Sequence, residues 1–448
     1  MSRFCRQRLY STIPRVGEFI EKIKSSFLQD PGKYLHEINR TRHEILGPMY
    51  LERIGPDVDA LFIADPEIVR KIFSLESKYP KHFIPQAWSV YGDMRNRKRG
   101  LFFLDGPEWL RMRRVLNPIL LNNDSVHKFV PFFEKEARRF LNNVEANSSP
   151  PPSNSSQKYG TFKNLPIELH RWSVRSILAV IFGDSNILSE EEEEGLIEDV
   201  QIIFDISARL QFTSALESCR QNTPDWIDFS SAADRVFELL NKSIKNTNVN
   251  SKSLSGVLIS QGVSYEDVER IAMDFVIAAV DTTSISTLWI LHLISQDTYI
   301  QNEIRTSFDN QLLRNCMREA SRLYPVSPFI TRVLDKDILI EGSKLRTGQL
   351  ILFSIYTMSR NPNYFTKPEH FMPQRWDITP SSFASIPFGF RARSCIGKKL
   401  AELSMETLIK GLIQRYKIHC LNYEKAEMIM KFIGLPDRTI KIGLEHIV

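Results

Sequence analysis

The longest uninterrupted helical pattern in the chain runs from about residue 264 to about residue 295. It begins with Ser264, a good helix cap, followed by the acids Glu266 and Asp267, and it contains no proline or glycine. About 30 residues at 1.5 Å each span roughly 45 Å, the width of a domain. The segment is too apolar for a surface helix and carries too many charges for lipid. We therefore predict a helix that crosses the middle of the protein.

The rest of the chain predicts more helices and a minor sheet. Helices are expected at 107–121, 197–216, 312–324 and 398–415, and strands within 48–63 and at 337–341, 350–353, 427–433 and 439–444, the last two as a pair. Residues 81–106 lack periodicity and predict a long loop, and the polar stretch 147–158 predicts a disordered insertion. The predicted fold class is mainly α with a smaller β region (α+β). Residues 11–448 would form one domain with a β-rich N-terminal lobe and an α-helical lobe.

The first ten residues differ from the body of the chain in charge. The formal net charge is +5, of which Arg3, Arg6 and Arg8 supply three, and Glu18 is the first acid. The body is therefore nearly neutral, which gives no indication of nucleic-acid binding. An Arg-rich, hydroxyl-containing start without acids is typical of a mitochondrial transit peptide, here residues 1–10, although an ordinary basic tail has the same composition.

Five cysteines occur without a CxxC pair, which favours a reducing compartment over a disulfide framework. Cys395 lies in a short loop between Gly389 and Gly397, and a helical pattern begins at Lys398. A thiolate at a helix start is stabilised by the helix dipole, so we expect a lowered pKa and a capacity to ligate a metal. As an axial haem ligand, a thiolate favours O–O cleavage. The alternative for a single cysteine is a buried structural role.

The Cys395 loop resembles the haem-binding signature of the cytochrome P-450 superfamily. The residues in register are Phe388, Gly389, Arg393, Cys395 and Gly397. The resemblance implies a haem b cofactor with Cys395 as the axial ligand of the iron. The family normally has glycine where this chain has Arg391. Glycine at such a turn often adopts a positive φ, where a residue with a Cβ atom loses roughly 1–2 kcal/mol.

Two further segments resemble the family's cofactor and oxygen motifs. Trp109 and Arg113, four residues apart on one helix face, match a pair that hydrogen-bonds a haem propionate, and Arg332 and Arg393 match further propionate-binding arginines. Asp281 and Thr282 match the oxygen-activation motif, in which a break in the helix holds water and the pair relays protons. The alternative is a threonine that bonds back to its own helix.

A third resemblance concerns structural charges. Glu319 and Arg322 match the family's ExxR pair, and Arg375 matches the arginine of its aromatic-x-Pro-x-Arg pattern. In isolation such a pair is usually a surface ion pair of little energetic value. In the family it secures the fold near the haem loop.

Several features resemble the mitochondrial branch of the family. They are the basic N-terminus and the cationic residues Arg314, Arg318, Lys398 and Lys399. The resemblance implies that these cations dock an acidic, adrenodoxin-like ferredoxin, which an NADPH-dependent reductase reduces. Solvated helix charges are the alternative reading.

The resemblance implies a monooxygenase that hydroxylates an apolar, sterol- or steroid-like substrate with dioxygen. It would lie on the matrix side of the inner mitochondrial membrane, in peripheral contact with that membrane. Only ten residues separate Gln301 from Leu312, where the family usually has a longer segment. A haem-thiolate isomerase or dehydratase, or a degenerate non-catalytic member, is the alternative.

Overall fold

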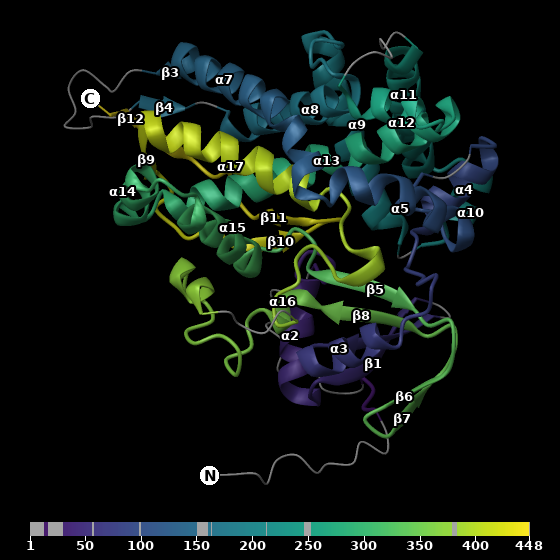
Figure 1. Cartoon of the computed structure of the whole chain (residues 1–448). Coiled ribbons are helices and arrows are strands. Elements are labelled where there is room, and N and C mark those ends of the chain that lie inside the picture. Colours follow the sequence, from purple (N-terminus) through teal and green to yellow (C-terminus); the bar gives the residue numbers. More distant parts are fainter. Residues whose placement is uncertain are drawn as a thin grey trace.

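The computed structural model describes residues 13–16, 30–55, 58–97, 100–149, 160–162, 164–211, 213–245, 252–378 and 383–447. The predicted transit peptide at residues 1–10 lies outside these ranges. The described chain forms a large helical lobe and a smaller lobe with a sheet (Figure 1).

The predicted central helix is confirmed as α13, Tyr265–Ile294. The Ser264 hydroxyl accepts the backbone N–H of Asp267 at 3.2 Å and caps its first turn. Helix α8 (Leu165–Phe182) packs along α13 more extensively than any other helix, and α17 (Lys398–Arg415) is among the further helices that contact it. Helix α8 is buried on almost every side and ends at Gly183, whose φ of 86° is the left-handed conformation that terminates helices.

Most of the remaining helices pack around these in the upper lobe of Figure 1, whereas α2 (Leu35–Leu46), α3 (Pro66–Ser74) and α16 (Ile355–Met358) lie in the smaller lobe beside its sheet. The others are α4 (Gln86–Met94), α5 (Gly106–Leu120), α6 (Asn123–Val126), α7 (Val130–Asn147), α9 (Glu190–Leu210), α10 (Ala215–Gln221), α11 (Pro224–Lys245), α12 (Leu254–Ser260), α14 (Thr298–Thr306) and α15 (Gln311–Leu323), and 3-10 turns lie at His127–Phe129, Pro373–Asp377 and Arg391–Arg393.

The largest sheet of the smaller lobe has the strand order β1-β2-β8-β5. Its strands are β1 (Met49–Gly55), β2 (Val58–Ile63), β8 (Leu350–Ser354) and β5 (Phe329–Val333). β2 and β8 are parallel, with Ala60 opposite Leu350, whereas the outer pairs are antiparallel. The lobe predicted as N-terminal therefore takes half of its main sheet from the second half of the chain.

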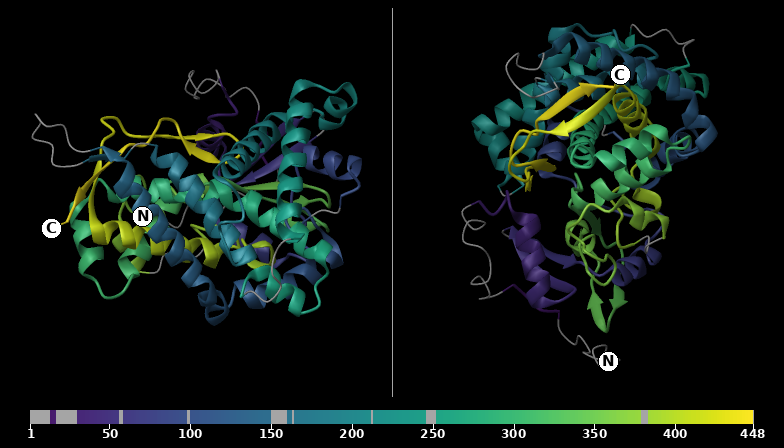
Figure 2. Two further views of the ribbon diagram at one scale, coloured as in Figure 1. Left: turned by 90° about the horizontal axis from the view of Figure 1, so that it is seen from above. Right: turned by 90° about the vertical axis from the view of Figure 1, so that its left-hand side faces the viewer.

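A second sheet joins the C-terminal strands to two short strands from the first half of the chain. Its order is β3 (Ser148–Ser149), β4 (Gly160–Phe162), β12 (Ile442–His446) and β9 (Tyr416–Cys420). Figure 2 shows the yellow C-terminal strands along one edge of the helical lobe. Two hairpins complete the β structure: β6 (Ile338–Ile340) with β7 (Ser343–Leu345), and β10 (Met428–Met430) with β11 (Gly434–Pro436).

These strands correct two predictions. The segments 427–433 and 439–444 do not pair with each other, because a closer turn pairs β10 with β11 and leaves β12 to bridge β9 and β4. The predicted insertion at 147–158 begins with the end of α7 and with β3, and its part from residue 150 onward lies outside the described residues.

Two helix predictions also change. The loop expected at 81–106 contains α4, whose buried face is formed by Ala87, Trp88 and Tyr91, too short a pattern to stand out in the sequence. The helix expected at 197–216 begins earlier, as α9, and ends at Leu210, before the separate helix α10.

In the short segment after Gln301, a connection of four residues, 307–310, joins α14 to α15. Asn310 anchors this connection to α17, since its side chain bonds Glu406 and accepts from Lys410 Nζ at 2.5 Å. The shortened connection is thus compatible with an intact contact between α15 and α17.

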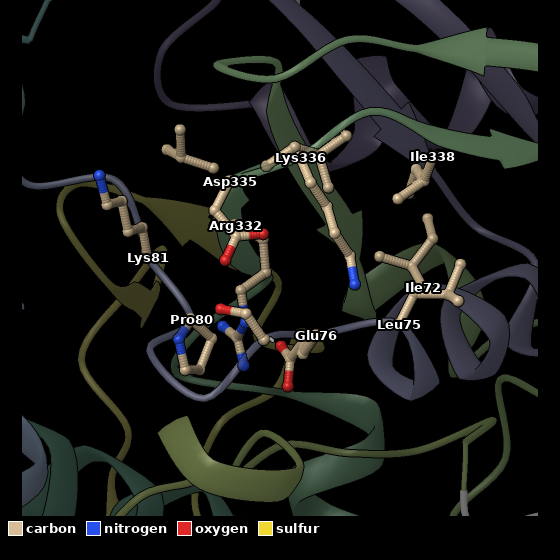
Figure 3. Close-up of a pocket in the computed structure, with 12 residues that line it drawn as sticks. Ile72, Leu75, Glu76, Pro80, Lys81, Arg332, Asp335, Lys336 and Ile338 are labelled. Carbon is tan, nitrogen blue, oxygen red and sulfur yellow. Dashed lines mark hydrogen bonds and ion pairs between the residues drawn. The ribbon is translucent and has the colours of Figure 1, made fainter. Parts of the chain in front are cut away.

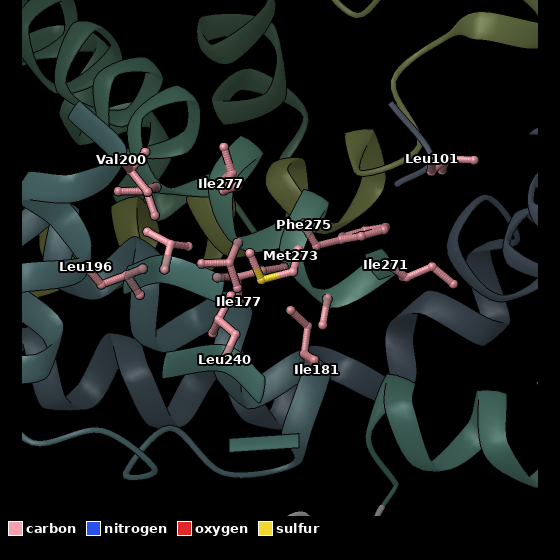
Figure 4. Packing of buried hydrophobic residues seen from close by; sticks show 14 of the residues in the cluster. Leu101, Ile177, Ile181, Leu196, Val200, Leu240, Ile271, Met273, Phe275 and Ile277 are labelled. Carbon is pink, nitrogen blue, oxygen red and sulfur yellow. The ribbon is translucent and has the colours of Figure 1, made fainter. Parts of the chain in front are cut away.

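The largest apolar core lies where α8, α9, α11 and α13 meet. Figure 4 shows Ile177 and Ile181 of α8 close to Met273 of α13, with Leu196 and Val200 of α9 alongside. Among the described residues, α13 is the one helix long and apolar enough to cross a membrane, and 78% of its most apolar window is buried inside the protein. It is therefore the core helix of the fold, as predicted.

Candidate active site: the Cys395 loop and the accessible face of α13

The Cys395 loop is held by its own backbone. The N–H of Cys395 donates to the carbonyl of Phe388 at 2.8 Å, and the N–H of Gly389 donates to that of Ile386 at 2.9 Å. Gly389 has a φ of 73° and Arg391 a φ of 58°. The predicted left-handed conformation at the position of Arg391 is therefore confirmed, and an arginine occupies a backbone geometry that favours glycine.

Helix α17 begins directly after this loop, with Gly397 as its N-cap. The Cys395 side chain is exposed although protein groups surround the loop. The expected lowering of its pKa is wrong for the free thiol: burial, the largest effect, raises the pKa, while the Gly397 N–H and the Arg113 charge oppose that rise. Protein groups surround the sulfur closely enough that desolvation exceeds the helix-start effect, even though Cys395 keeps accessible surface.

One face of α13 is accessible although the helix runs through the core. Between Arg270 and Ile294, the residues that are not buried are Asp274, Ala278, Ala279, Thr282 and Ser286. Four of them are spaced four apart, so they form a single stripe along the helix. Small and polar side chains on one stripe of a buried helix leave room for a ligand on that side.

The predicted break in α13 is wrong, because the helix is continuous through Asp281 and Thr282. Thr282 Oγ1 donates to the carbonyl of Ala278 at 2.6 Å, which is the back-bonding that the sequence left as an alternative. Asp281 is buried and points to α8, where its Oδ1 lies 3.0 Å from His170 Nε2. Thr282 thus belongs to the accessible stripe, and Asp281 belongs to the neighbouring helix contact.

The structure brings together the predicted residues Trp109, Arg113 and Arg393. The Arg393 guanidinium stacks on the Trp109 ring, 4.0 Å from its centroid, and Arg113 Nη1 donates to the carbonyl of Ser394 at 3.1 Å. Arg393 also pairs with Asp105, just before α5. Burial lowers the pKa of both arginines to about 10. These side chains join the start of α5 to the Cys395 loop.

Arg332 lies on β5 beside Glu76, a partner that the sequence did not reveal. Its Nε donates to Glu76 Oε1 at 2.6 Å, and both side chains are nearly buried. Figure 3 shows this pair with Pro80 at one edge of a small pocket that Lys336 and Ile72 also line. The charges of Arg391 and Arg393 also act on Glu76.

Four guanidinium groups and two carboxylates therefore interact around Arg393: Arg113, Arg332, Arg391 and Arg393 with Glu76 and Asp105. This leaves two positive charges uncompensated. Among the described residues, Arg332 Nη2 and Arg113 Nε are buried without a hydrogen-bond partner. Buried donors are normally paired, so the cluster has capacity for anionic oxygens. Haem b carries two propionates, and these residues fit it.

The structural charges are confirmed in geometry. Glu319 and Arg322 are both fully buried, and Arg322 Nη2 donates to Glu319 Oε1 at 2.8 Å. Arg375 Nε reaches the same oxygen at 2.8 Å, and Trp376 Nε1 reaches Oε2 at 3.0 Å. This network joins α15 to the 3-10 turn at residues 373–377.

The four predicted docking residues lie on adjacent helices, Arg314 and Arg318 on α15 and Lys398 and Lys399 on α17. They are not isolated cations. Arg314 lies 3.5 Å from Glu406, Lys398 lies 3.8 Å from Glu402, and Lys399 bonds Asn123. Arg318 stacks 4.0 Å over the Trp376 ring. All but Lys399 are exposed, so the surface is basic but interleaved with acids.

Asp274 is a further polar residue of the stripe that the sequence did not single out. Its Oδ2 accepts the backbone N–H of Phe102 at 2.7 Å. A Cβ atom at Gly100 would lie 2.1 Å from its Oδ1, so a glycine is required there. Burial raises the pKa of Asp274 to about 7. Asp274 thus fastens the 100–104 segment to α13 at one end of the accessible stripe.

A core helix with one accessible stripe, a cysteine loop at a helix start and an arginine cluster with capacity for two anionic groups are together the features of a haem-thiolate protein. A comparison with models of protein families identifies the family. The family model for Cytochrome P450 matches residues 13–444, and the chain belongs to that family. The predicted fold, the haem b cofactor and the monooxygenase class are confirmed.

Similar curated proteins identify the mitochondrial type. Cytochrome P450 315a1, mitochondrial, of Drosophila melanogaster is 30% identical over 460 residues, covering 96% of this chain and 87% of that protein. The cholesterol side-chain cleavage enzyme, mitochondrial, of Oncorhynchus mykiss is 26% identical, covering 93% and 86%. Cytochrome P450 11B2, mitochondrial, of Mus musculus is 27% identical, covering 90% and 85%.

Proposed function

We propose that this chain hydroxylates an apolar, sterol- or steroid-like substrate with dioxygen and electrons from a ferredoxin. The observation that carries the proposal is the accessible stripe of α13, which has the small residues Ala278 and Ala279 at its middle and the buried apolar side chains of Phe275 and Ile277 next to it on the same helix. A site with apolar walls and few polar groups suits a substrate of that kind. The similarity to a cholesterol side-chain cleavage enzyme supports the sterol class.

The residues of the site take distinct roles in this proposal. Cys395 would bind the haem iron through its thiolate, with Phe388 and Gly397 shaping its loop, and Trp109, Arg113, Arg332 and Arg393 would hold the propionates. When bound, haem b supplies the iron at which dioxygen is activated, and a thiolate ligand favours O–O cleavage. Asp281 and Thr282 hold and move the protons. The Thr282 hydroxyl, 2.6 Å from the Ala278 carbonyl, is the polar group of the stripe nearest in sequence to Asp281.

The electron donor and the location belong to the same proposal. An acidic ferredoxin, reduced by an NADPH-dependent reductase, would dock on the surface of α15 and α17 that carries Arg314, Arg318, Lys398 and Lys399. Complementary charge steers such encounters. The similarity to mitochondrial proteins supports a mitochondrial location, and we place the chain on the matrix side of the inner membrane, in peripheral contact with it. A single domain over residues 11–448 agrees with the extent of the family match.

One spectrum tests the axial ligand. The reduced, carbon monoxide-bound protein should show the red-shifted Soret band of a thiolate-ligated haem. Cys395→Ala should abolish that band. Cys420→Ala is the matched control, because Cys420 lies on β9 with its Sγ 3.9 Å from His292 Nδ1 and outside the loop. A normal band in Cys395→Ala, or its absence in the folded parent protein, would refute the proposal.

A further inference from the structure

One buried ionisable residue touches the proposed proton relay without belonging to any motif. His170 lies on α8, and its Nε2 is 3.0 Å from Asp281 Oδ1 on α13. His170 is 7% exposed and Asp281 is 6% exposed, so water screens neither group well. The two helices pack along one another, and Figure 4 shows side chains of both in a shared apolar core.

The other ring nitrogen fixes the tautomer of His170. Its Nδ1 lies 2.7 Å from the carbonyl oxygen of Pro166, one turn earlier on α8. A carbonyl oxygen only accepts hydrogen bonds, so Nδ1 carries a hydrogen. Nε2 then carries a lone pair if the imidazole is neutral, or a second hydrogen if it is an imidazolium.

That tautomer determines the proton count of the pair. If Nε2 and Oδ1 were both unprotonated, two lone pairs would face each other at 3.0 Å in a buried site. With the neutral imidazole assigned, Oδ1 has no donor among the described residues. The pair is satisfied only when one proton lies between the two atoms, either on the imidazole or on the carboxyl.

The same stretch of α8 also holds the helix backbone beside the relay. Ser173, three residues after His170, donates from Oγ to the carbonyl of Ala279 at 2.8 Å. Helix α8 therefore fixes both the acid and a carbonyl of the accessible stripe, within one turn of Thr282. A residue that holds an acid through a hydrogen bond sets its orientation and its protonation state.

We propose that His170 is a positioning residue of the proton relay, which orients Asp281 and keeps one proton shared between Nε2 and the carboxyl. This inference rests on the proposed function, because it gives Asp281 a part in proton delivery. The shared proton lies one residue from Thr282 and on the side of α13 away from the ligand. His170 thereby orients the acid that precedes Thr282 and keeps a proton at it.

The first test observes the proton directly and needs no turnover. Nitrogen-15 spectra of histidine-labelled protein are recorded in the reduced, carbon monoxide-bound holoenzyme, which is diamagnetic. We expect one Nε2 resonance of a protonated or strongly hydrogen-bonded nitrogen, which disappears in His170→Gln and moves in Asp281→Asn. An Nε2 resonance typical of a free lone pair, unchanged in Asp281→Asn, would overturn the proposal.

The second test measures the consequence for oxygen chemistry. Hydrogen peroxide released per NADPH consumed is measured with a ferredoxin and its reductase, per carbon monoxide-binding haem. His170→Gln keeps an N–H donor near the Nε2 position but stores no proton, whereas His170→Phe removes both. We expect the peroxide ratio to rise several-fold in His170→Gln and further in His170→Phe.

A matched control separates this role from packing. His292 is another buried histidine, on α13 itself, and bonds Gln296 at 3.1 Å, far along the helix from Thr282. His292→Gln should leave the peroxide ratio unchanged. Equal ratios in all the variants and the parent protein would refute the positioning role. Absence of NADPH consumption in the parent would instead contradict the proposed electron donor, and the spectra would still decide the role of His170.

Discussion

Glu319 offers the sharpest test of how burial determines the value of an ion pair. We consider Glu319→Gln, which keeps the size of the side chain and removes its charge. The chain contains a matched control, because Glu67 and Arg70 have the same three-residue spacing and the same 2.8 Å separation as Glu319 and Arg322. The exposed fractions are 50% and 55% in the control pair and 0% in the buried pair.

The expected loss follows from the donors around Glu319. Oε1 accepts from Arg322 Nη2, Arg375 Nε and the N–H of Met372, and Oε2 accepts from Arg322 Nε and Trp376 Nε1. In either orientation of the glutamine amide, its NH₂ group faces at least two of these donors. Each unsatisfied buried donor costs about 1–3 kcal/mol, and breaking a buried pair costs about 3–5 kcal/mol. We expect about 4 kcal/mol for Glu319→Gln and under about 1 kcal/mol for Glu67→Gln.

Equilibrium unfolding in urea measures both values. The haem-loaded variants are compared with the parent by the shift of the midpoint at constant slope, because a changed slope would indicate a changed unfolding transition. The carbon monoxide spectrum confirms that the haem site is retained. Losses within about 0.5 kcal/mol of each other would refute the reasoning, since the two pairs share spacing and separation but differ in burial and in the additional buried donors around Glu319.

Three further predictions concern the surroundings of the site. Asp274→Asn should stabilise the protein above pH 7 by at most about 4 kcal/mol, which urea unfolding measured against pH would show. The pKa of Asp274 is about 7 in the folded protein and near 3.8 in the unfolded chain. The stability that Asp274 contributes relative to the variant is therefore fully present below the unfolded pKa and is lost as the pH rises through the folded pKa. Arg391→Gly should relieve up to about 1 kcal/mol of backbone strain and retain haem, as haem-transfer rates would show; faster haem loss would contradict this. Arg314→Glu with Lys398→Glu should raise the KM for ferredoxin at low salt, and an equal rise in Lys344→Glu, on the distant β7 strand, would contradict it.

Local sequence patterns predicted the helices in which apolar residues recur with a clear helical period. The bounds of α13 follow from its apolar spacing, its cap and the absence of proline or glycine, and those of α17 from its helical pattern after the Cys395 loop. The spacing of Glu319 and Arg322 predicts only that they share a helix face, and the resemblance to the family predicted their buried role. The positive φ of Arg391 was predicted from the glycine that the family normally has at this position. These features depend on residues within a turn or two of each other, where the sequence order determines the spatial neighbours.

The remaining features depend on partners that sequence spacing does not predict. Glu76 and Arg332 are 256 positions apart, and Asp274 meets Phe102 across 172 positions. His170 and Asp281 meet only because α8 and α13 pack side by side. The pKa of Cys395 was predicted in the wrong direction for the same reason, because desolvation is set by the whole surrounding fold.

The strand order of the two larger sheets has a consequence for biosynthesis. A chain that emerges N-terminus first presents the β1–β2 hairpin long before its neighbour, since Ala60 pairs with Leu350. At about 5–20 residues per second, the hairpin waits roughly 15–60 s with its apolar face exposed, and an isolated hairpin is only marginally stable. We expect the nascent chain to need a chaperone over that interval. The second sheet can form only later, because Leu444 must pair with Gly160. Folding is therefore completed only when the last residues have been released.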